Sequence, residues 1–168
     1  MLYLTKILFL TIIHRYLTLN NALNTHSCYT SLYFYFGSIM SSDYHPNPVN
    51  NQSNVLGTAL ASCCFDPLTG YYRNGFCHTG NHDVGQHTVC AKMTSEFLNF
   101  SASRGNDLIT PLPEYGFVGL QPGDYWCICA LRWVEALDLD MAPQIKLEAC
   151  HESLLSLVDI DTLKRFAL

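Results

Sequence analysis

Two cysteines separated by a single residue, Cys127 and Cys129, lie in an apolar run over residues 125–130. The run has the length and composition of a buried β-strand, and alternate side chains of a strand project from one face. The two thiols would then lie about 7 Å apart. Thiols at that spacing are suited to metal coordination, to redox chemistry, or to packing as small apolar side chains in a core.

The first hypothesis is a zinc site, because zinc favours four cysteine or histidine ligands in proteins. If a strand over residues 89–93 lies beside residues 125–130, the thiol of Cys90 approaches those of Cys127 and Cys129. The predicted metal ligands are Cys77, His87, Cys90, Cys127 and Cys129. The alternative is that these cysteines pack as small buried residues, since their spacing is not the paired Cys-x-x-Cys of zinc ribbons.

The second hypothesis is a reactive thiol, with Cys77, His87 and Cys90 as the predicted catalytic residues. A cysteine nucleophile needs a neighbouring base or cation, and His87 precedes Cys90 by three residues. Positions i and i+3 of a straight strand face opposite ways, so that pair requires a bend. Cys77 lies in a loop to which His87 could fold back. The alternative is that Cys77 packs this loop, or forms a disulfide with Cys63 under oxidising conditions.

Two further histidines, His78 and His82, lie four residues apart, as two metal ligands on a helix would. Gly80 and Asn81 between them argue against a helix, so both histidines are interpreted as surface residues of a loop. The sequence contains no glycine loop for a phosphate, no nucleophile-elbow motif and no dinucleotide fingerprint.

The third hypothesis is a binding cleft after a helix that ends at Gly105. The predicted ligand-binding residues are Arg104, Asn106, Asp107 and Tyr115. Arg104 could grip a carboxylate or phosphate through two parallel hydrogen bonds. The alternative is structural, because asparagine and aspartate after a helix commonly bind the local backbone and Arg104 could pair with a nearby acid.

The elements that position these residues follow from periodicity and from capping residues. Strands are predicted over residues 54–60, 89–93, 125–130 and 144–149. Helices are predicted from an N-cap at Thr94 to Gly105, from Ala130 past Leu137, over residues 153–157, and after a cap at Asp159. Residues 106–124 contain several prolines and glycines and predict a long loop. The expected fold is α+β, a small mixed sheet of three to five strands with helices packed on one side.

The first 42 residues differ in composition from the rest of the chain, because they contain no acidic residue and only Lys6 and Arg15 as fixed cations. Residues 1–39 are interpreted as an unstructured or targeting extension, or as untranslated sequence if translation starts at Met40. The apolar stretch between the two cations is too short to span a bilayer, so no transmembrane segment is predicted. Residues 40–53 read as an extended polar leader, and residues 54–168 as a single α+β domain.

The chain from Asp43 onward carries all 14 acidic residues. This acidic balance argues against nucleic acid as a partner, because phosphates require a basic surface. The apolar content is sufficient for a core without disulfides, so reduced thiols and a cytoplasmic location are expected. A mitochondrial or plastid location is the alternative if residues 1–39 are a transit peptide, and secretion if they are a signal peptide.

Several segments carry a resemblance to a known family. They are Asn54-Val55-Leu56-Gly57, Asp66-Pro67-Leu68-Thr69-Gly70, His87-Thr88-Val89-Cys90-Ala91, Ser103-Arg104-Gly105-Asn106-Asp107-Leu108, Pro113-Glu114-Tyr115-Gly116-Phe117, Pro122-Gly123-Asp124, Trp126-Cys127-Ile128-Cys129-Ala130 and Leu147-Glu148-Ala149. From Asn54 to the C-terminus the chain resembles domain-of-unknown-function family 2237, small proteins seen mainly in bacteria. The resemblance implies cysteine at positions 63, 77, 90, 127 and 129 and histidine at 87 and 151. It implies no activity, cofactor or catalytic residue.

Three functions therefore remain open from the sequence. The first is a small binding or accessory module with a cysteine-lined core that coordinates zinc. The second is a thiol-dependent enzyme that uses a Cys/His pair, and the third is a purely structural interaction protein. The sequence identifies neither a substrate nor a partner for any of the three.

Overall fold

The computed structural model describes residues 52–168. The extension expected over residues 1–39, and all but the last two residues of the leader expected over 40–53, lie outside this part. The elements in chain order are β1 (Val89–Lys92), α2 (Ser95–Ser103), the 3₁₀ helix η3 (Pro113–Tyr115), β2 (Tyr125–Ile128), α3 (Ala130–Asp138), the 3₁₀ helices η4 (Leu147–Ala149) and η5 (Glu152–Ser156), and α4 (Ile160–Arg165).

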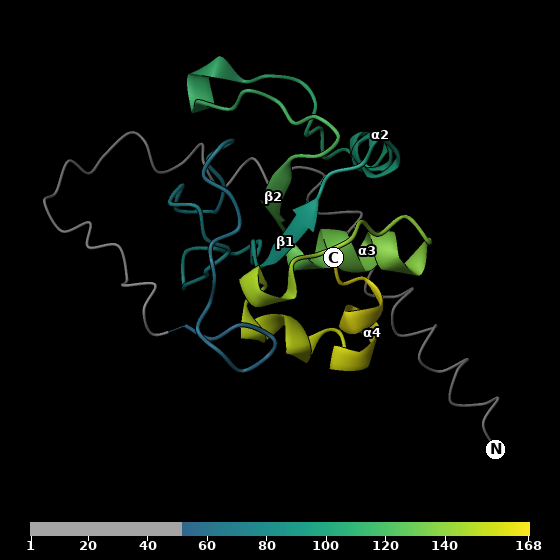
Figure 1. The fold of residues 1–168 in the computed structure, drawn as a ribbon. Coiled ribbons are helices and arrows are strands. Elements are labelled where there is room, and N and C mark those ends of the chain that lie inside the picture. Colours follow the sequence, from purple (N-terminus) through teal and green to yellow (C-terminus); the bar gives the residue numbers. More distant parts are fainter. Residues whose placement is uncertain (1–51) are drawn as a thin grey trace, which may run out of the picture. The chain divides into compact units, whose positions relative to one another are not determined.

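The sheet consists of β1 and β2, which run antiparallel at the centre of the described fold (Figure 1). Val89 pairs with Ile128, and Cys90 pairs with Cys127. The condition that the zinc hypothesis placed on these two segments, that they lie side by side, is met. Because the strands are antiparallel, the C-terminal end of β2 lies beside the loop that precedes β1, which brings residues 83–87 to the start of α3.

The mixed α+β composition is confirmed, whereas a sheet of three to five strands is not: the described residues form one two-stranded sheet. The expected strand over residues 144–149 is reduced to isolated bridges from Ile145 to Ala91 and to Ala167. The chain then turns into η4, where the backbone N–H of Ala149 donates to the carbonyl of Lys146 at 2.9 Å.

The segment over residues 54–60 forms a turn instead of the expected strand. The side chain of Asn54 is buried and donates to Thr58 Oγ1, to the carbonyl of Ala59 and to the carbonyl of Glu148. Its Oδ1 accepts from the backbone N–H groups of Leu56 and Thr58. An asparagine that satisfies several backbone groups in this way stabilises a turn at the expense of a strand ladder.

The predicted helix caps are confirmed at two places. Thr94 accepts from the backbone N–H of Phe97 at 3.1 Å and starts α2, and Asp159 accepts from Thr162 N at 2.9 Å and starts α4. The predicted helix over residues 153–157 is present as the 3₁₀ helix η5. Its first turn is capped by His151, whose Nδ1 accepts from the N–H of Ser153.

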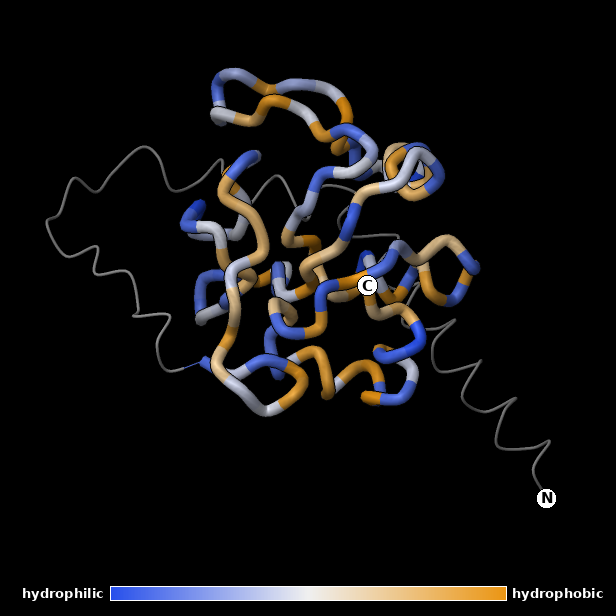
Figure 2. Tube along the Cα trace, viewed as in Figure 1, coloured by the Kyte–Doolittle hydropathy of each residue, from blue (hydrophilic) through white to orange (hydrophobic). Residues whose placement is uncertain are grey.

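The core surrounds the two strands and the inner face of α3. Trp133 of α3 is fully buried, and its indole N–H donates to the carbonyl of Pro143 at 3.1 Å. Phe97 of α2 and Leu163 of α4 are also buried. Apolar and polar stretches alternate along the trace (Figure 2), and none of the described helices is long and apolar enough to cross a membrane.

Four cysteines are oxidised in the structure. Disulfides join Cys63 to Cys90 and Cys77 to Cys127. The expectation of reduced thiols is wrong for these four residues, and the suggested Cys63–Cys77 disulfide is replaced by two bonds that tie the preceding loops to the strands. Disulfides are typical of oxidising compartments, which is not the setting expected from a cytoplasmic location.

Candidate active site

A cysteine, a histidine and an aspartate form a hydrogen-bonded series where the sheet meets α3. The sulfur of Cys129 lies 3.3 Å from Nε2 of His87. Nδ1 of the same imidazole lies 2.6 Å from Oδ1 of Asp83. The second carboxylate oxygen of Asp83 accepts from the backbone N–H of His87 at 2.8 Å. The Asp83 side chain is 0% exposed and that of His87 is 20% exposed, so the imidazole joins a buried carboxylate to a partly accessible edge.

The loop over residues 83–87 holds the acid and the base in place. The backbone N–H of Gln86 donates to the carbonyl of Asp83 at 3.0 Å, and Gln86 adopts a left-handed φ of 48°. The carbonyl of Gln86 accepts from the backbone N–H of Ala130, the first residue of α3. This last hydrogen bond ties the loop to the helix and brings His87 against Cys129.

Cys129 is the N-cap residue of α3 and not the last residue of β2. Its carbonyl accepts from the N–H groups of Arg132 and Trp133, as expected for a cap. A sulfur at this place lies near the positive end of the dipole of a nine-residue helix. The expectation that Cys129 continues the strand beyond Cys127 is therefore wrong.

Gly85 leaves room beside the thiol. A Cβ atom at this position would lie 3.1 Å from the sulfur of Cys129 and 3.0 Å from Cε1 of His87. The ring of Tyr71 stacks on the imidazole of His87 at a centroid distance of 5.7 Å. The Tyr71 hydroxyl donates to the carbonyl of His82. The hydrogen bond to Asp83 and the stacked ring of Tyr71 together fix the orientation of the imidazole.

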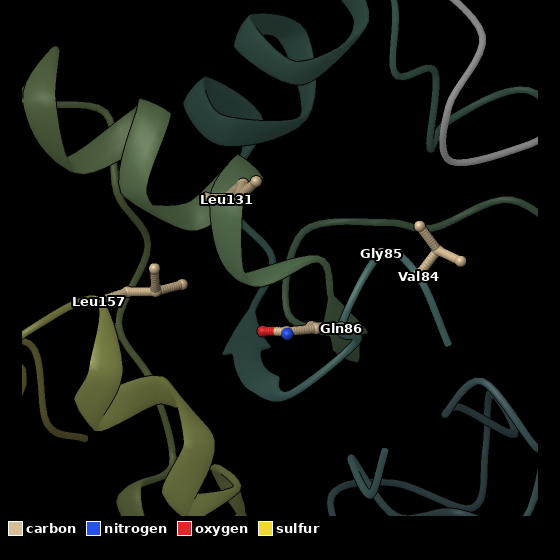
Figure 3. A pocket seen from close by; sticks show the side chains of 5 residues that line it. All are labelled: Val84, Gly85, Gln86, Leu131 and Leu157. Carbon is tan, nitrogen blue, oxygen red and sulfur yellow. The ribbon is translucent and has the colours of Figure 1, made fainter. Parts of the chain in front are cut away.

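A pocket of about 160 Å³ adjoins this group. It is lined by Val84, Gly85, Gln86, Leu131 and Leu157. Figure 3 shows the amide of Gln86 and the side chain of Leu157 pointing toward one another, with Leu131 on the first turn of α3 above them. Gly85 belongs both to the pocket wall and to the surroundings of the thiol, whereas Cys129 and His87 themselves do not line the pocket.

The chemistry that this arrangement permits is proton transfer from the thiol to the imidazole. A carboxylate on Nδ1 holds the proton there and leaves Nε2 as the acceptor that faces the sulfur. Cysteine nucleophiles of this kind need a base on one side and a group that orients the base on the other. Cys129, His87 and Asp83 supply these three roles in that order.

Two further histidines, His78 and His151, are buried, contrary to the surface position expected for His78. Nε2 of His78 lies 2.8 Å from the amide of Asn74, and its Nδ1 has no hydrogen-bond partner among the described residues. Burial lowers the pKa of His78 and the charge of His151 lowers it further, while Asp83 acts in the opposite direction. Burial also lowers the pKa of His151, against the opposing effect of Glu152. Both imidazoles are thus favoured in the neutral form.

The predicted metal ligands are divided between two groups. Cys77 and Cys127 lie with Cys63 in a buried cluster whose three sulfur atoms are all within 4.8 Å of one another. Cys90 is joined to this cluster through its disulfide with Cys63. The other two predicted ligands, His87 and Cys129, contact each other instead. Cys63 was not among the predicted ligands.

The predicted catalytic residues are likewise placed apart. His87 contacts a thiol, but that thiol is Cys129, because Cys77 and Cys90 are both in disulfides. The sequence did not predict the contact of His87 with Cys129 or its contact with Asp83. Two signals pointed to them: an aspartate four residues before the histidine, and a cysteine at the junction of a strand and a helix.

The remaining thiols of the described residues differ in environment. Burial raises the pKa of Cys150 to about 12, and its sulfur accepts from the backbone N–H of Cys90. Such a thiol is inert at neutral pH. Cys64 is half-buried, and its thiol donates to the carbonyl of Asp66.

Among the residues predicted to line a cleft, the side chains of Arg104, Asn106 and Asp107 make hydrogen bonds to other residues of the described fold. Arg104 pairs with Glu135 of α3 at 2.7 Å, and the buried amide of Asn106 donates to Ser101 Oγ. The carboxylate of Asp107 accepts from Ile109 and from Thr110, and these hydrogen bonds lower the pKa of its carboxyl. Ligand binding by these residues and Tyr115 stays a prediction.

Comparison with known proteins identifies one family. The model of a family described as "Uncharacterized protein conserved in bacteria (DUF2237)" matches residues 53–167. A search of curated proteins finds no match. The matched range contains the thiol group, the pocket and both disulfides.

Proposed function

Since the chain belongs to this family of uncharacterized proteins conserved in bacteria, whose description names no activity, we propose a function from its own residues: a thiol-dependent enzyme of the acyl-transfer class. The observation that supports the proposal is the series from the Cys129 sulfur, at 3.3 Å from His87 Nε2, to Asp83, at 2.6 Å from His87 Nδ1. A cysteine that is held in a disulfide, or that is only packed in the core, does not require a hydrogen-bonded histidine and aspartate beside it.

The proposed reaction starts with transfer of the Cys129 proton to Nε2 of His87. The sulfur then attacks the carbonyl carbon of an ester, thioester or amide, and a new C–S bond forms. As the bond from this carbon to the leaving group breaks, His87 returns the proton to the leaving atom. Water, deprotonated by His87, then hydrolyses the acyl-enzyme and restores the thiol.

Developing negative charge on the carbonyl oxygen requires nearby donors. The first turn of α3 is the natural source, because the first N–H groups of a helix have no partner inside the helix. The N–H of Ala130 donates to Gln86 and those of Arg132 and Trp133 to Cys129, which leaves Leu131 as the proposed oxyanion donor. Leu131 also lines the pocket, so the proposed donor belongs to a residue at the space where the acyl group would lie.

The test is trapping of the acyl-enzyme in a variant whose half-buried thiol is removed by Cys64→Ser. The protein is mixed with a neutral thioester of a short acid, and its mass is followed on the timescale of a single turnover. We expect one acyl group on Cys129, and no acylation after Cys129→Ser. Acylation that is absent, or that persists in Cys129→Ser, would contradict the proposal.

A second candidate function is zinc coordination by the reduced protein, and it is favoured by the cluster of Cys63, Cys77 and Cys127. Four thiolates at about 2.3 Å from a zinc ion lie about 3.8 Å from one another, and sulfurs within 4.8 Å need little movement to reach that arrangement. Cys90, released from its disulfide with Cys63, would be the fourth ligand. This function corresponds to the binding or accessory module expected from the sequence.

Zinc binding in this form requires that both disulfides be reduced, with two electrons each from a phosphine or dithiol. The reduced protein is dialysed anaerobically against zinc and its metal content is measured. About one zinc per chain, lost after Cys127→Ser and retained after Cys64→Ser, is the expected result. Reduced protein that retains no zinc would exclude the site.

A further inference from the structure

The pocket beside Cys129 has an apolar rim that is open to solvent. Val84 is 77% exposed, Leu131 is 66% exposed and Leu157 is 43% exposed. Single exposed apolar side chains are ordinary on protein surfaces. Here three of them, from the 83–87 loop, from α3 and from the segment after η5, gather around one pocket (Figure 3).

The five residues that line the pocket include no charged side chain. Its polar side-chain group is the amide of Gln86, which points into the space between Leu131 and Leu157 in Figure 3. An amide donates and accepts hydrogen bonds without a net charge, so it can bind a neutral polar group. Burial of an anion against this lining would leave its charge without a partner, which is costly.

The apolar rim and the uncharged lining both bear on the acyl group that would be attached to the reacting carbonyl. Gly85 lines the pocket and also lies against both Cys129 and His87, so the pocket and the thiol share this residue as a common wall. We infer that the substrate is an uncharged acyl donor whose short apolar acyl chain occupies this pocket. This inference rests on the proposed acyl-transfer function.

Alkylation of Cys129 tests the inference without requiring turnover. In each reaction the sulfur displaces iodide, a C–S bond forms and the thiol proton passes to His87. Iodoacetamide, N-butyl iodoacetamide and iodoacetate provide a neutral, an apolar and an anionic probe of similar chemistry. In a Cys64→Ser background, we expect the butyl reagent to react at least about tenfold faster than iodoacetamide, and iodoacetate to react more slowly, each relative to its rate with free cysteine.

Leu131→Asp is the informative variant, because the side chain is exposed and lines the pocket. It should abolish the preference for the butyl reagent while iodoacetamide still reacts. Leu139→Asp is the matched control, because Leu139 is an exposed leucine at the other end of α3, and it should retain the preference.

The outcomes separate the two proposals. If Cys129 reacts readily with iodoacetamide but shows no preference for the butyl reagent, the inferred substrate class is wrong and the thiol centre stands. If Leu139→Asp removes the preference as fully as Leu131→Asp does, the pocket is not its source. If Cys129 reacts with none of the three reagents faster than free cysteine, both proposals fail.

Discussion

At the scale of single residues, the thiols of this protein differ through their neighbours. Cys150 has a pKa raised to about 12 by burial, and four other cysteines are held in disulfides. Cys129 has an imidazole within 3.3 Å and a helix N-terminus beneath it. Cys129 is also buried, so it is these neighbours that distinguish it from Cys150.

Asp83 is a positioning residue in this account, because it contacts His87 and not the sulfur. Asp83→Asn preserves the shape of the side chain but removes the charge that fixes the His87 tautomer. We expect the alkylation rate of Cys129 at neutral pH to fall at least about tenfold, with a changed pH profile. The exposed carboxylate Asp138 provides the control, because Asp138→Asn should leave rate and profile unchanged. An unaltered pH profile in Asp83→Asn would refute this role.

The two buried histidines predict a dependence of stability on pH. The pKa values of His78 and His151 are lowered below the ordinary 6.5, so the unfolded chain binds protons that the folded protein does not. The free energy of unfolding should therefore be at its full value above pH 6.5 and should fall as the pH drops from there toward the lowered values.

Urea unfolding at neutral pH and at about pH 5 measures this effect. His78→Gln should reduce the difference between the two midpoints, and the change of an exposed histidine, His82→Gln, should not. The pKa of the Asp107 carboxyl is also lowered, from an ordinary value of 3.8. Its protonation therefore changes the stability only at a pH below that of either urea measurement. Equal urea midpoints at the two pH values would contradict the conclusion that His78 and His151 are buried in their neutral form.

At the scale of elements, local signals predicted β1, β2, α2, α3 and α4, because each has a cap or a hydrophobic period of its own. They did not predict residues 144–149, where alternation that suits a strand also suits isolated bridges followed by a 3₁₀ turn. They also did not place Cys129, because alternation alone does not reveal where a strand passes into a helix cap.

The close packing of the 83–87 loop on the start of α3 should be sensitive to a side chain at Gly85. Gly85→Ala would put a methyl group 3.1 Å from the sulfur of Cys129, which forces the loop and the helix apart by a few tenths of an ångström. Slower alkylation of Cys129 and a loss of about 1 kcal/mol or more in unfolding free energy are expected. Asn81→Ala, an exposed change nearby in the same loop region, should alter neither quantity. A Gly85→Ala protein with wild-type reactivity would show that the contact is looser than described.

At the scale of the whole molecule, the disulfides join segments that are distant in sequence. Their connectivity was beyond sequence reasoning, because the pairing of cysteines depends on which loops return to the sheet. His87 was predicted as a functional residue, but its partners were not, since Asp83 and Cys129 meet through the same return of the chain.

Reduction of the disulfides should destabilise the whole described fold. The bonded cysteines are 27 and 50 residues apart in the sequence. Because each disulfide restricts the unfolded chain, each contributes about 4 kcal/mol to the free energy of unfolding. Urea unfolding with and without a phosphine reductant measures the loss in metal-free protein. If zinc binds the four released thiols, added zinc should restore much of this stability. Identical unfolding curves with and without reductant would show that the disulfides are not formed.

The central claim is that His87 activates Cys129, and the rate of Cys129 alkylation by iodoacetamide as a function of pH tests it most directly. The comparison is between the Cys64→Ser protein and the same protein with His87→Gln. The account predicts a rate that stays high from alkaline pH down through neutrality, and one that falls steadily with pH, as for free cysteine, once His87 is replaced. Superimposable profiles for the two proteins would contradict it.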